Sequence, residues 1–360
     1  MLPLAADPAE CAAKRQVRGV AETGFEKMLS PSGPRRQPLA GFDDDYTDIV
    51  DYIVRCTHKI WEERQHHLIR SHYTPDCVIH TLSGDVRDAE TVVANTIATL
   101  QAFPDRELIP ESVIWTGNDR EGFYTSHRIM SPMTNLGASD FGPATGKTCR
   151  VRTIADCRIS ENRIFEEWLA RDNRALVQQL GLDIVEVAKH LASLDRTKPK
   201  DAWIWIESER ERVRAGRASA GPVSGTVLDD VRARFQSLWN TGESALTNYA
   251  EDVQVNAPGG RAFKGSAHAT GLVQEIRSGL SDIRLTVDHL AAIPYFDKGY
   301  EVAVRWCLAG RHTGQYLIPA TGAEVLILGM THWRVVEDRV IEEWTVFDEI
   351  AVLRQMFRSL

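Results

Sequence analysis

Residues 158–180 read RISENRIFEEWLARDNRALVQQL, and the same pattern returns at residues 334–356 as RVVEDRVIEEWTVFDEIAVLRQM. The two stretches are 176 residues apart, and nine of their 23 positions carry the same amino acid. Two shorter motifs keep the same spacing, namely Pro-Ala-Thr-Gly at 143–146 and 319–322, and Tyr-x-x-Asp at 73–76 and 249–252. Chance does not hold one register over so long a span, so the chain is predicted to contain two copies of one domain.

Each copy of the pattern predicts a β-hairpin followed by a helix. Asn162 and Asp338 suit the left-handed position that a three-residue hairpin loop requires. Helical spacing begins just after Asp172 and Asp348, and an aspartate at that position can cap the helix.

The expected strand register assigns the two faces of the sheet. A three-residue loop at 161–163 would pair Ala155 with Leu169, and cross-strand partners share a face. The more apolar face is expected to line a pocket and carries Thr153, Ala155, Cys157, Phe165, Glu167 and Leu169. The outer face is expected to carry Arg152, Asp156, Arg158, Glu166 and Trp168.

Length and composition limit the class of protein. The chain has 360 residues, which favours two or three domains, and 43% of them are hydrophobic, as in ordinary globular proteins. The net charge of −8 gives no basic surface for nucleic acid, so no nucleic-acid partner is expected. Six cysteines without Cys-x-x-Cys spacing predict reduced thiols in a cytoplasmic protein. No apolar run is long enough to cross a membrane and no signal peptide pattern opens the chain, so no membrane partner is expected.

Four segments are expected along the chain. Residues 1–44 read as a mobile or wrapping arm, and 45–182 as the first domain. Residues 183–226 read as a helical connector that ends in the flexible linker GRASAGPVSGT, and 227–360 as the second domain. Each domain reads as helix, strand, helix and then long, mostly antiparallel strands. This order predicts an α+β fold in which a curved sheet wraps around helices and leaves a cone-shaped pocket.

The motifs resemble a known family. The pattern begins with a strand that contains Arg and continues through a polar turn to Ile or Val, which stands two residues before Glu and four before Trp. An Asp and a helix that ends in QQLG (178–181) follow. This order of motifs resembles that of SnoaL-like polyketide cyclases of the NTF2-like superfamily. The second copy adds RHTG at 311–314, IPATG at 318–322 and Phe263-x-Gly265. The resemblance covers about 45–182 and 227–360. It implies two NTF2-like cones, an outer sheet face used for pairing as an intramolecular pseudo-dimer, and a possible homodimer.

The same resemblance shows where this sequence departs from the family. The family's catalytic acid sits just after the Trp, where this chain has Leu169 and Thr345. A pocket histidine commonly sits three residues before the Arg, where it has Ala155 and Thr331. Both copies depart at both positions, so neither half can perform the family's acid–base aldol closure unchanged.

The remaining inward or pocket-bordering polar residues are the candidate site. Glu167 and Glu343 lie two residues before the lost acid positions, and a carboxylate in an apolar pocket can act as a general base. The expected catalytic residues are Glu343, His312, Arg305 and Glu167. The expected ligand-binding residues are His80, His127, Asn256, Tyr316, Thr331 and Thr345. No metal or cofactor is expected, and the helical row His58, Glu62 and His66 is interpreted as a solvated face in preference to a metal site.

Two functions stay open at this point. One is a cofactor-free enzyme of cyclase, isomerase or lyase type that applies general acid–base chemistry to an oxygenated, partly apolar metabolite. The other is a non-catalytic small-molecule-binding or scaffold protein. The second pocket is expected to be the better formed, with Glu343 facing His312 or Arg305. An open pocket around the inward glutamates would favour catalysis, and a filled core that ties each glutamate to arginine would favour binding or structure.

Overall fold

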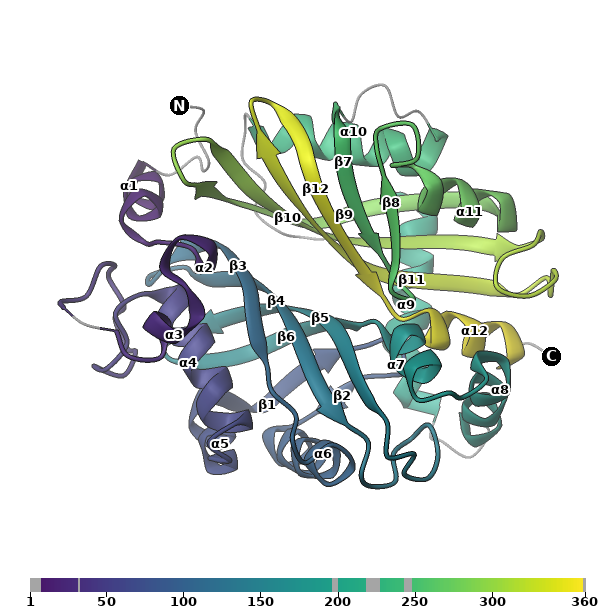
Figure 1. Cartoon of the computed structure of the whole chain (residues 1–360), viewed down its shortest axis with the longest axis horizontal. Helices are drawn as coiled ribbons and strands as arrows, with labels where there is room; N and C mark the ends of the chain where they lie inside the picture. The colour runs from purple at the N-terminus through teal and green to yellow at the C-terminus, as the bar shows by residue number, and fades with distance from the viewer. Residues whose placement is uncertain (1–7, 32, 196–199, 218–226, 243–247, 359–360) are drawn as a thin grey trace. The chain divides into compact units, whose positions relative to one another are not determined.

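The computed structural model describes residues 8–31, 33–195, 200–217, 227–242 and 248–358, so most of the expected linker lies outside the described residues. The described residues form two compact units. The first contains those of Met1–Thr81, Asp85–Leu169 and Ala291–Asp297, and the second those of Leu82–Gly84, Ala170–Leu290 and Lys298–Leu360. Each unit is built around one six-stranded sheet (Figure 1).

The first sheet has the strand order β2-β1-β6-β5-β4-β3. Its strands are β1 (Tyr73–His80), β2 (Val86–Arg87), β3 (Ile109–Asn118), β4 (Gly122–Thr134), β5 (Thr148–Ser160) and β6 (Arg163–Arg171). β1 pairs with β6 in parallel, whereas its pairing with β2 and the β3–β4–β5 pairings are antiparallel. Its helices are α4 (Ile49–Trp61), η1 (His66–Leu68), α5 (Ile69–His72) and α6 (Ala89–Ala102), and α4–α6 lie on one face of the sheet (Figure 1).

The second sheet repeats this topology with the order β8-β7-β12-β11-β10-β9. Its strands are β7 (Tyr249–Ala257), β8 (Arg261–Lys264), β9 (Leu280–Tyr295), β10 (Gly299–His312), β11 (Glu324–Val336) and β12 (Arg339–Phe347). Its helices are α10 (Val227–Thr241), α11 (Gly271–Gly279) and α12 (Glu349–Arg358). The expected α+β fold with one mostly antiparallel sheet per repeat is therefore confirmed.

The hairpin turns differ from the expected three-residue loops. Glu337 and Asp338 both have positive φ, as do Glu161 and Asn162, which is the backbone of a two-residue type I′ turn. In the second repeat Val336 pairs with Arg339, and a register shift follows before Arg334 pairs with Glu342. The extra residue is therefore taken up by a β-bulge within the strand instead of by the loop.

The bulge changes one face assignment and preserves the rest. Beyond it, Thr331 pairs with Thr345, which is the register expected for Ala155 and Leu169. Phe165 was expected on the inner face, but the Arg158 guanidinium lies 4.8 Å from the centre of its ring, so Phe165 shares the outer face with Arg158.

The expected aspartate caps are confirmed. The Asp172 carboxylate accepts a hydrogen bond from Ala175 N at 3.0 Å at the start of α7 (Asn173–Gln179). The Asp348 carboxylate accepts one from Ala351 N at the start of α12, also at 3.0 Å. Both lie in the second unit, where Asn173 Nδ2 also donates to Asp348 at 2.5 Å. The last helix of the first repeat is therefore part of the second compact unit.

The connector is helical and folds onto the second sheet. Its elements are α8 (Ile184–Asp195), η2 (Lys200–Trp203) and α9 (Ile204–Arg214). Asp195 accepts from Arg354 Nε of α12 at 2.6 Å, and both side chains are buried. Arg212 of α9 donates to Asp288 of β9 at 2.8 Å. These ion pairs fix α8 and α9 to the second repeat.

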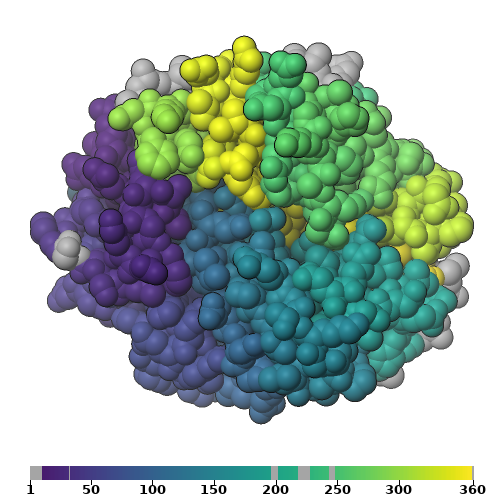
Figure 2. Space-filling model, viewed as in Figure 1, coloured from purple at the N-terminus to yellow at the C-terminus, as the bar shows by residue number. Residues whose placement is uncertain are grey.

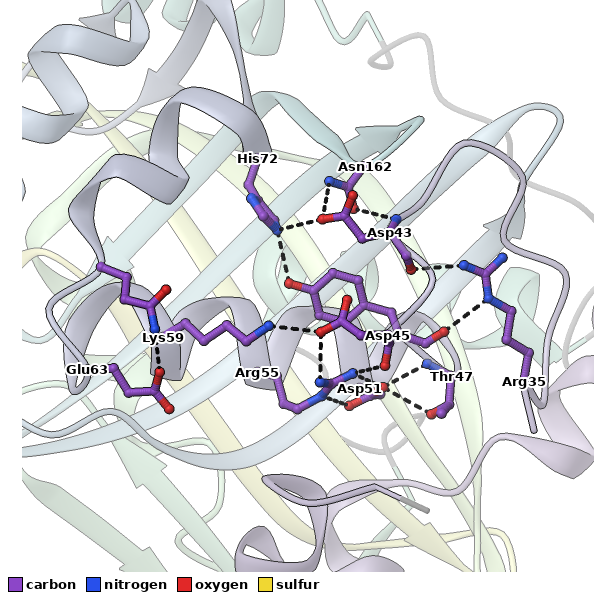
Figure 3. A network of polar contacts seen from close by, with 12 residues as sticks. Arg35, Asp43, Asp45, Thr47, Asp51, Arg55, Lys59, Glu63, His72 and Asn162 are labelled. Atoms are coloured by element: carbon purple, nitrogen blue, oxygen red, sulfur yellow. Dashed lines mark hydrogen bonds and ion pairs between the residues drawn. The ribbon is translucent and has the colours of Figure 1, made fainter. Parts of the chain in front are cut away.

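The arm wraps around the first repeat. It contains α1 (Pro8–Gln16), α2 (Val20–Thr23) and α3 (Phe25–Met28), and its purple surface adjoins that of the first repeat in Figure 2. The Arg35 guanidinium donates to three backbone carbonyls of the arm, those of Leu39, Phe42 and Asp43, and to the carbonyl of Tyr46 at the start of the first domain. Asp43 then exchanges two hydrogen bonds with Asn162 of the hairpin turn (Figure 3). These hydrogen bonds join the described end of the arm to the hairpin turn of the first repeat.

Two further features bear on location and chemistry. All six cysteines are free thiols, and five of them are buried. No helix in the described part of the chain combines the length and apolar character needed to span a bilayer.

Candidate functional site

The inner face of each sheet is the one against which the helices pack. In the second repeat, Phe235 of α10 lies 6.1 Å from the Trp306 ring and 5.6 Å from the Trp333 ring, measured between centroids. Pairing across the sheet places Thr331, Thr345 and Glu343 on this same face. In the first repeat, Leu169 packs with a core cluster drawn from α4, α6 and β1.

Glu343 is a buried carboxylate that accepts hydrogen bonds from three neutral donors. Its Oε2 accepts hydrogen bonds from the Tyr249 hydroxyl at 2.6 Å and from Trp333 Nε1 at 2.7 Å. Its Oε1 accepts from the Thr345 hydroxyl at 2.8 Å. Burial raises the pKa of Glu343, while the hydrogen bonds from Tyr249, Thr345 and Trp333 act in the opposite direction. No arginine is among its hydrogen-bond partners in the described residues.

A directed chain of hydrogen bonds extends from this carboxylate into the aromatic core. Trp306 Nε1 lies 3.1 Å from the Thr331 hydroxyl, which lies 2.9 Å from the Thr345 hydroxyl. Because Thr345 donates to Glu343, Thr331 donates to Thr345 and accepts from Trp306. Three more aromatic side chains pack here and are almost fully buried, namely Phe235, Trp239 and Phe347. The second interior is therefore filled with indole and phenyl rings around Glu343, and the hydroxyl and indole groups of this row all have hydrogen-bond partners.

The first repeat keeps the carboxylate and its tyrosine but loses the large rings. Tyr73 donates to Glu167 Oε2 at 3.0 Å, as Tyr249 does to Glu343. The 176-residue offset places Cys157 where the second repeat has Trp333. The same offset makes Thr153 equivalent to Gly329. Ile129 pairs with Thr153 and Trp306 pairs with Gly329, so Ile129 stands where the second repeat has the Trp306 indole.

Four buried polar side chains on the inner face of the first sheet each carry an atom that has no hydrogen-bond partner in the described residues. Their atoms are Thr125 Oγ1, His127 Nε2, Ser131 Oγ and Thr153 Oγ1. Strand pairing sets Thr125 opposite Cys157, and His127 opposite Ala155, in adjacent rows of the same face. Burial lowers the pKa of His127 to about 3, so its imidazole is neutral at physiological pH. These four atoms of the first inner face contrast with the fully hydrogen-bonded row around Glu343 in the second repeat, where His312 Nε2, at the far end of the sheet, is a buried atom without a partner among the described residues.

His312 and Glu343 lie at opposite ends of the second sheet. Glu343 pairs with Trp333 and Trp333 with Val302, whereas His312 is ten residues further along β10, which corresponds to roughly 33 Å of strand. His312 is buried, and its Nδ1 lies 3.0 Å from the Thr321 hydroxyl in the Pro-Ala-Thr-Gly loop. Burial lowers its pKa. The structure thus brings His312 to a loop and not to the glutamate.

Arg305 is also separated from Glu343. It pairs with Met330, one residue from Thr331, and therefore lies on the outer face of the sheet. There it helps lower the pKa of Asp288, against the larger effect of burial, which raises it. The expectation that Glu343 faces His312 or Arg305 is not met. His312 lies too far along the strand from Glu343, and Arg305 lies on the opposite face of the sheet.

The other expected binding residues have structural partners. His80 lies between two carboxylates, 2.9 Å from Asp85 and 3.3 Å from Glu166. Burial lowers the pKa of His80, but these two acids together outweigh it and raise the pKa overall. Asn256 Nδ2 donates to the Glu343 carbonyl at 3.1 Å. The buried Tyr316 hydroxyl donates to Glu349 at 2.8 Å.

The sequence did not predict that Tyr73 and Tyr249 bind the inward glutamates, or that Thr125, Ser131 and Thr153 leave buried hydroxyl groups without partners in the described part of the chain. Tyr73 and Tyr249 open the repeated Tyr-x-x-Asp motif, so the duplication itself carried the signal. The side chains of Thr125, Ser131 and Thr153 point to one face of two long strands, and the residues between them point to the other face. Nothing in the sequence distinguishes these hydroxyl groups from those that form hydrogen bonds with one another.

Comparisons with known proteins agree with the duplicated architecture. The family model described as SnoaL-like polyketide cyclase matches residues 52–180 and 229–356, which together make up more than half of the chain. No curated protein matches. Among solved structures, IdmH, described as a putative polyketide cyclase from Streptomyces antibioticus, is 25% identical and covers 37% of this chain and 97% of its own, with a TM-score of 0.32. AclR from Streptomyces galilaeus, described as a putative hydroxylase, is 22% identical over 36% of this chain and 92% of its own, also with a TM-score of 0.32. The chain therefore belongs to the SnoaL-like polyketide cyclase family and carries two copies of its domain in tandem.

Proposed function

We propose that the first repeat is the catalytic one and that the second has become structural. In this proposal the protein is a cofactor-free enzyme of cyclase, isomerase or lyase type that acts on an oxygenated, partly apolar metabolite. Glu167 is the general base, and His127 with the nearby hydroxyls binds the oxygen atoms of the substrate. The single observation that carries the proposal is the set of four unpartnered buried polar atoms on the first inner face.

The energetic cost of those atoms supports a role in binding. A buried polar group without a partner costs about 1–3 kcal/mol, and such groups are rare in folded proteins. Thr125, His127, Ser131 and Thr153 all carry such an atom and lie on one face. A ligand or ordered water that meets these groups would remove the cost, whereas a purely structural interior would have replaced them with apolar residues.

The difference between the repeats also favours the first. Cys157 and Ile129 stand where Trp333 and Trp306 fill the second interior, so the first holds less side-chain volume at equivalent positions. Leu169, at the family's acid position, is partly exposed, whereas Thr345 is 2% exposed. The first repeat is thus less completely buried than the second at the position where the family places its acid.

The chemistry follows from the geometry of Glu167. The Tyr73 hydroxyl donates to Glu167 Oε2 and so orients the carboxylate, and in this proposal the oriented carboxylate accepts a proton from a carbon acid next to a carbonyl. Neutral His127 lies on the same face at a Cα separation of roughly 12 Å, estimated from strand spacings, which a small substrate can span. An imidazole or hydroxyl that binds the carbonyl oxygen would stabilise the enolate as it forms. A positioned base of this kind accelerates proton transfer by about 10²–10⁴-fold.

The second candidate function is a non-catalytic binding protein. The observation that favours it is the loss of the family's acid position in both copies, at Leu169 and Thr345. The unpartnered polar groups serve a bound ligand equally well, so the two functions differ only in whether Glu167 transfers a proton.

A matched pair of variants tests the proposal. Small oxygenated carbonyl compounds are screened for binding by calorimetry and for conversion by mass spectrometry. Glu167→Gln should abolish conversion of a bound compound while binding persists, whereas Glu343→Gln should leave conversion within a few-fold of wild type. Equal loss in both variants, or loss only in Glu343→Gln, would refute the assignment to the first repeat. Tight binding without conversion of any compound by the wild type would establish the binding protein instead.

A further inference from the structure

Three side chains of metal-ligating type gather where α4 ends. His58 and Glu62 are one helical turn apart and therefore project from the same face of the helix. The chain then reverses at Arg64, which has a φ of 61°, and Gln65 N donates back to the Lys59 carbonyl at 3.0 Å. This reversal returns His66 toward the end of the helix it has just left.

The atom that each of these residues would offer to a metal is buried and makes no hydrogen bond. His58 Nδ1, Glu62 Oε2 and His66 Nε2 have no hydrogen-bond partner in the described residues. The other oxygen of Glu62 accepts a hydrogen bond from the Leu108 backbone, which fixes the carboxylate and leaves Oε2 unused. His58 Nδ1 and Glu62 Oε2 lie 3.6 Å apart, which is within ion-pair distance if the imidazole is protonated but too long for a hydrogen bond. A metal cation between the neutral imidazole and the carboxylate would satisfy both atoms.

We propose that His58, Glu62 and His66 bind a divalent transition metal ion, with Zn²⁺ the best match. Two imidazoles and one carboxylate are a common set of zinc ligands, and bonds of about 2.0–2.2 Å place neighbouring ligand atoms of a tetrahedral site roughly 3.4 Å apart. The His58–Glu62 separation is close to that value. In the described residues the three ligand atoms do not all lie within 4.8 Å of one another, so the His66 ring must turn inward to complete the site.

The surroundings of His58 fit a metal ligand. Metal-binding histidines usually direct their second ring nitrogen toward a carboxylate. His58 Nε2 lies 3.8 Å from Glu63 Oε1, and Glu63, labelled in Figure 3, is itself held by Gln65 Nε2 at 2.7 Å. His66 also lines a surface hollow of about 250 Å³ with Leu100 and Pro104, which gives an ion and a fourth, water ligand a route in from solvent.

A second cluster looks similar but already has its cation. Ligand atoms of Glu209, Asp288 and Cys307 lie within 4.8 Å of one another. The Arg212 guanidinium is 2.7 Å from Glu209 and 2.8 Å from Asp288, so it supplies the positive charge that a metal would bring. This cluster therefore serves as the internal comparison for the site on α4.

Metal binding to the full chain tests the proposal directly. Chelator-treated protein is dialysed against Zn²⁺ and its content measured, and Co²⁺ is titrated while the visible absorption of tetrahedral cobalt is followed. We expect one ion per chain, with affinity at least ten-fold weaker in His58→Gln, Glu62→Gln and His66→Gln. His67→Gln and Cys307→Ser are the matched controls, and both should bind as wild type does.

The possible results separate cleanly. Stoichiometric binding that is lost in the three ligand variants and kept in the two controls supports the site. Absence of stoichiometric binding, or equal affinity in the ligand variants, refutes it. Circular dichroism of each variant without metal shows whether it is folded, and a variant that has unfolded is replaced by the Asn substitution at the same position before the comparison is made.

Discussion

The unequal interiors predict that one chemical change has opposite effects on stability in the two repeats. Thr153→Val removes a buried hydroxyl that has no partner in the described residues. Thr345→Val removes one that donates to Glu343 and accepts from Thr331. Threonine and valine have nearly the same shape, so the comparison isolates the hydroxyl group.

The magnitudes follow from the hydrogen-bond inventory. Relieving an unpartnered buried hydroxyl should stabilise the protein by about 1 kcal/mol. Losing the bond from Thr345 to the buried carboxylate removes about 1.5–3 kcal/mol, and losing the bond from Thr331 removes about 1 kcal/mol more. Thr345→Val should therefore destabilise the protein by roughly 2.5–4 kcal/mol. For a repeat of this size, 1 kcal/mol shifts the melting temperature by about 4 °C.

Urea denaturation and calorimetry without ligand measure both effects. Trp306 and Trp333 report the second repeat by fluorescence, and Trp115 of β3 reports the first. Thr153→Ser is the control, because it keeps the hydroxyl and should not stabilise. If Thr153→Val destabilises the protein as much as Thr345→Val does, then the Thr153 hydroxyl has a partner and the contrast between the interiors is wrong.

Three further predictions concern the ion pairs, the caps and the arm. Asp195→Asn should cost about 3–5 kcal/mol in chemical denaturation because it leaves Arg354 buried without its carboxylate, whereas Glu186→Gln, in an exposed pair, should change stability by less than about 0.5 kcal/mol. Burial raises the pKa of Asp348 to about 6, so the folded state binds this proton more tightly than the unfolded state and the contribution of Asp348 to stability falls as pH rises from about 4 to about 6. Asp348→Asn keeps a side chain that can cap the helix but cannot titrate. In urea melts, the free energy of unfolding of the wild type minus that of the variant should fall by about 3 kcal/mol between about pH 4 and about pH 6. A difference that does not change with pH would contradict the burial argument. Arg35→Ala should release the arm and speed its proteolysis at least several-fold without lowering the melting temperature of the second repeat, and unchanged cleavage would show that the carbonyl contacts of Arg35 do not hold it.

Much of the fold could be predicted because its signals are local or repeated. The duplication is visible in identical spacing, the helix caps in single aspartates, and the inward position of Glu343 in strand parity. The two-residue turns were missed because a type I′ turn with a following bulge gives the same register as a three-residue loop. Pairing of the two outer sheet faces stays a prediction, which cross-linking of cysteines introduced at Asp156 and His332 would test.

The candidate site could be predicted only in part, because its state depends on what fills the space around it. The sequence by itself determined that each repeat has an inward glutamate, since period-two alternation fixes the face of a strand residue. It could not determine the partners of Glu343, because Tyr249, Trp333 and Thr345 reach it from different strands. Nor could it show that His312 lies some ten residues along the strand from Glu343, since that depends on the register of three paired strands. Only the tertiary structure decided that indoles fill the space around Glu343 in the second repeat, while the first keeps three buried hydroxyl groups without partners among the described residues on its inner face. The physical reason is that packing and hydrogen-bond satisfaction are properties of a closed volume, to which residues far apart in the sequence contribute together.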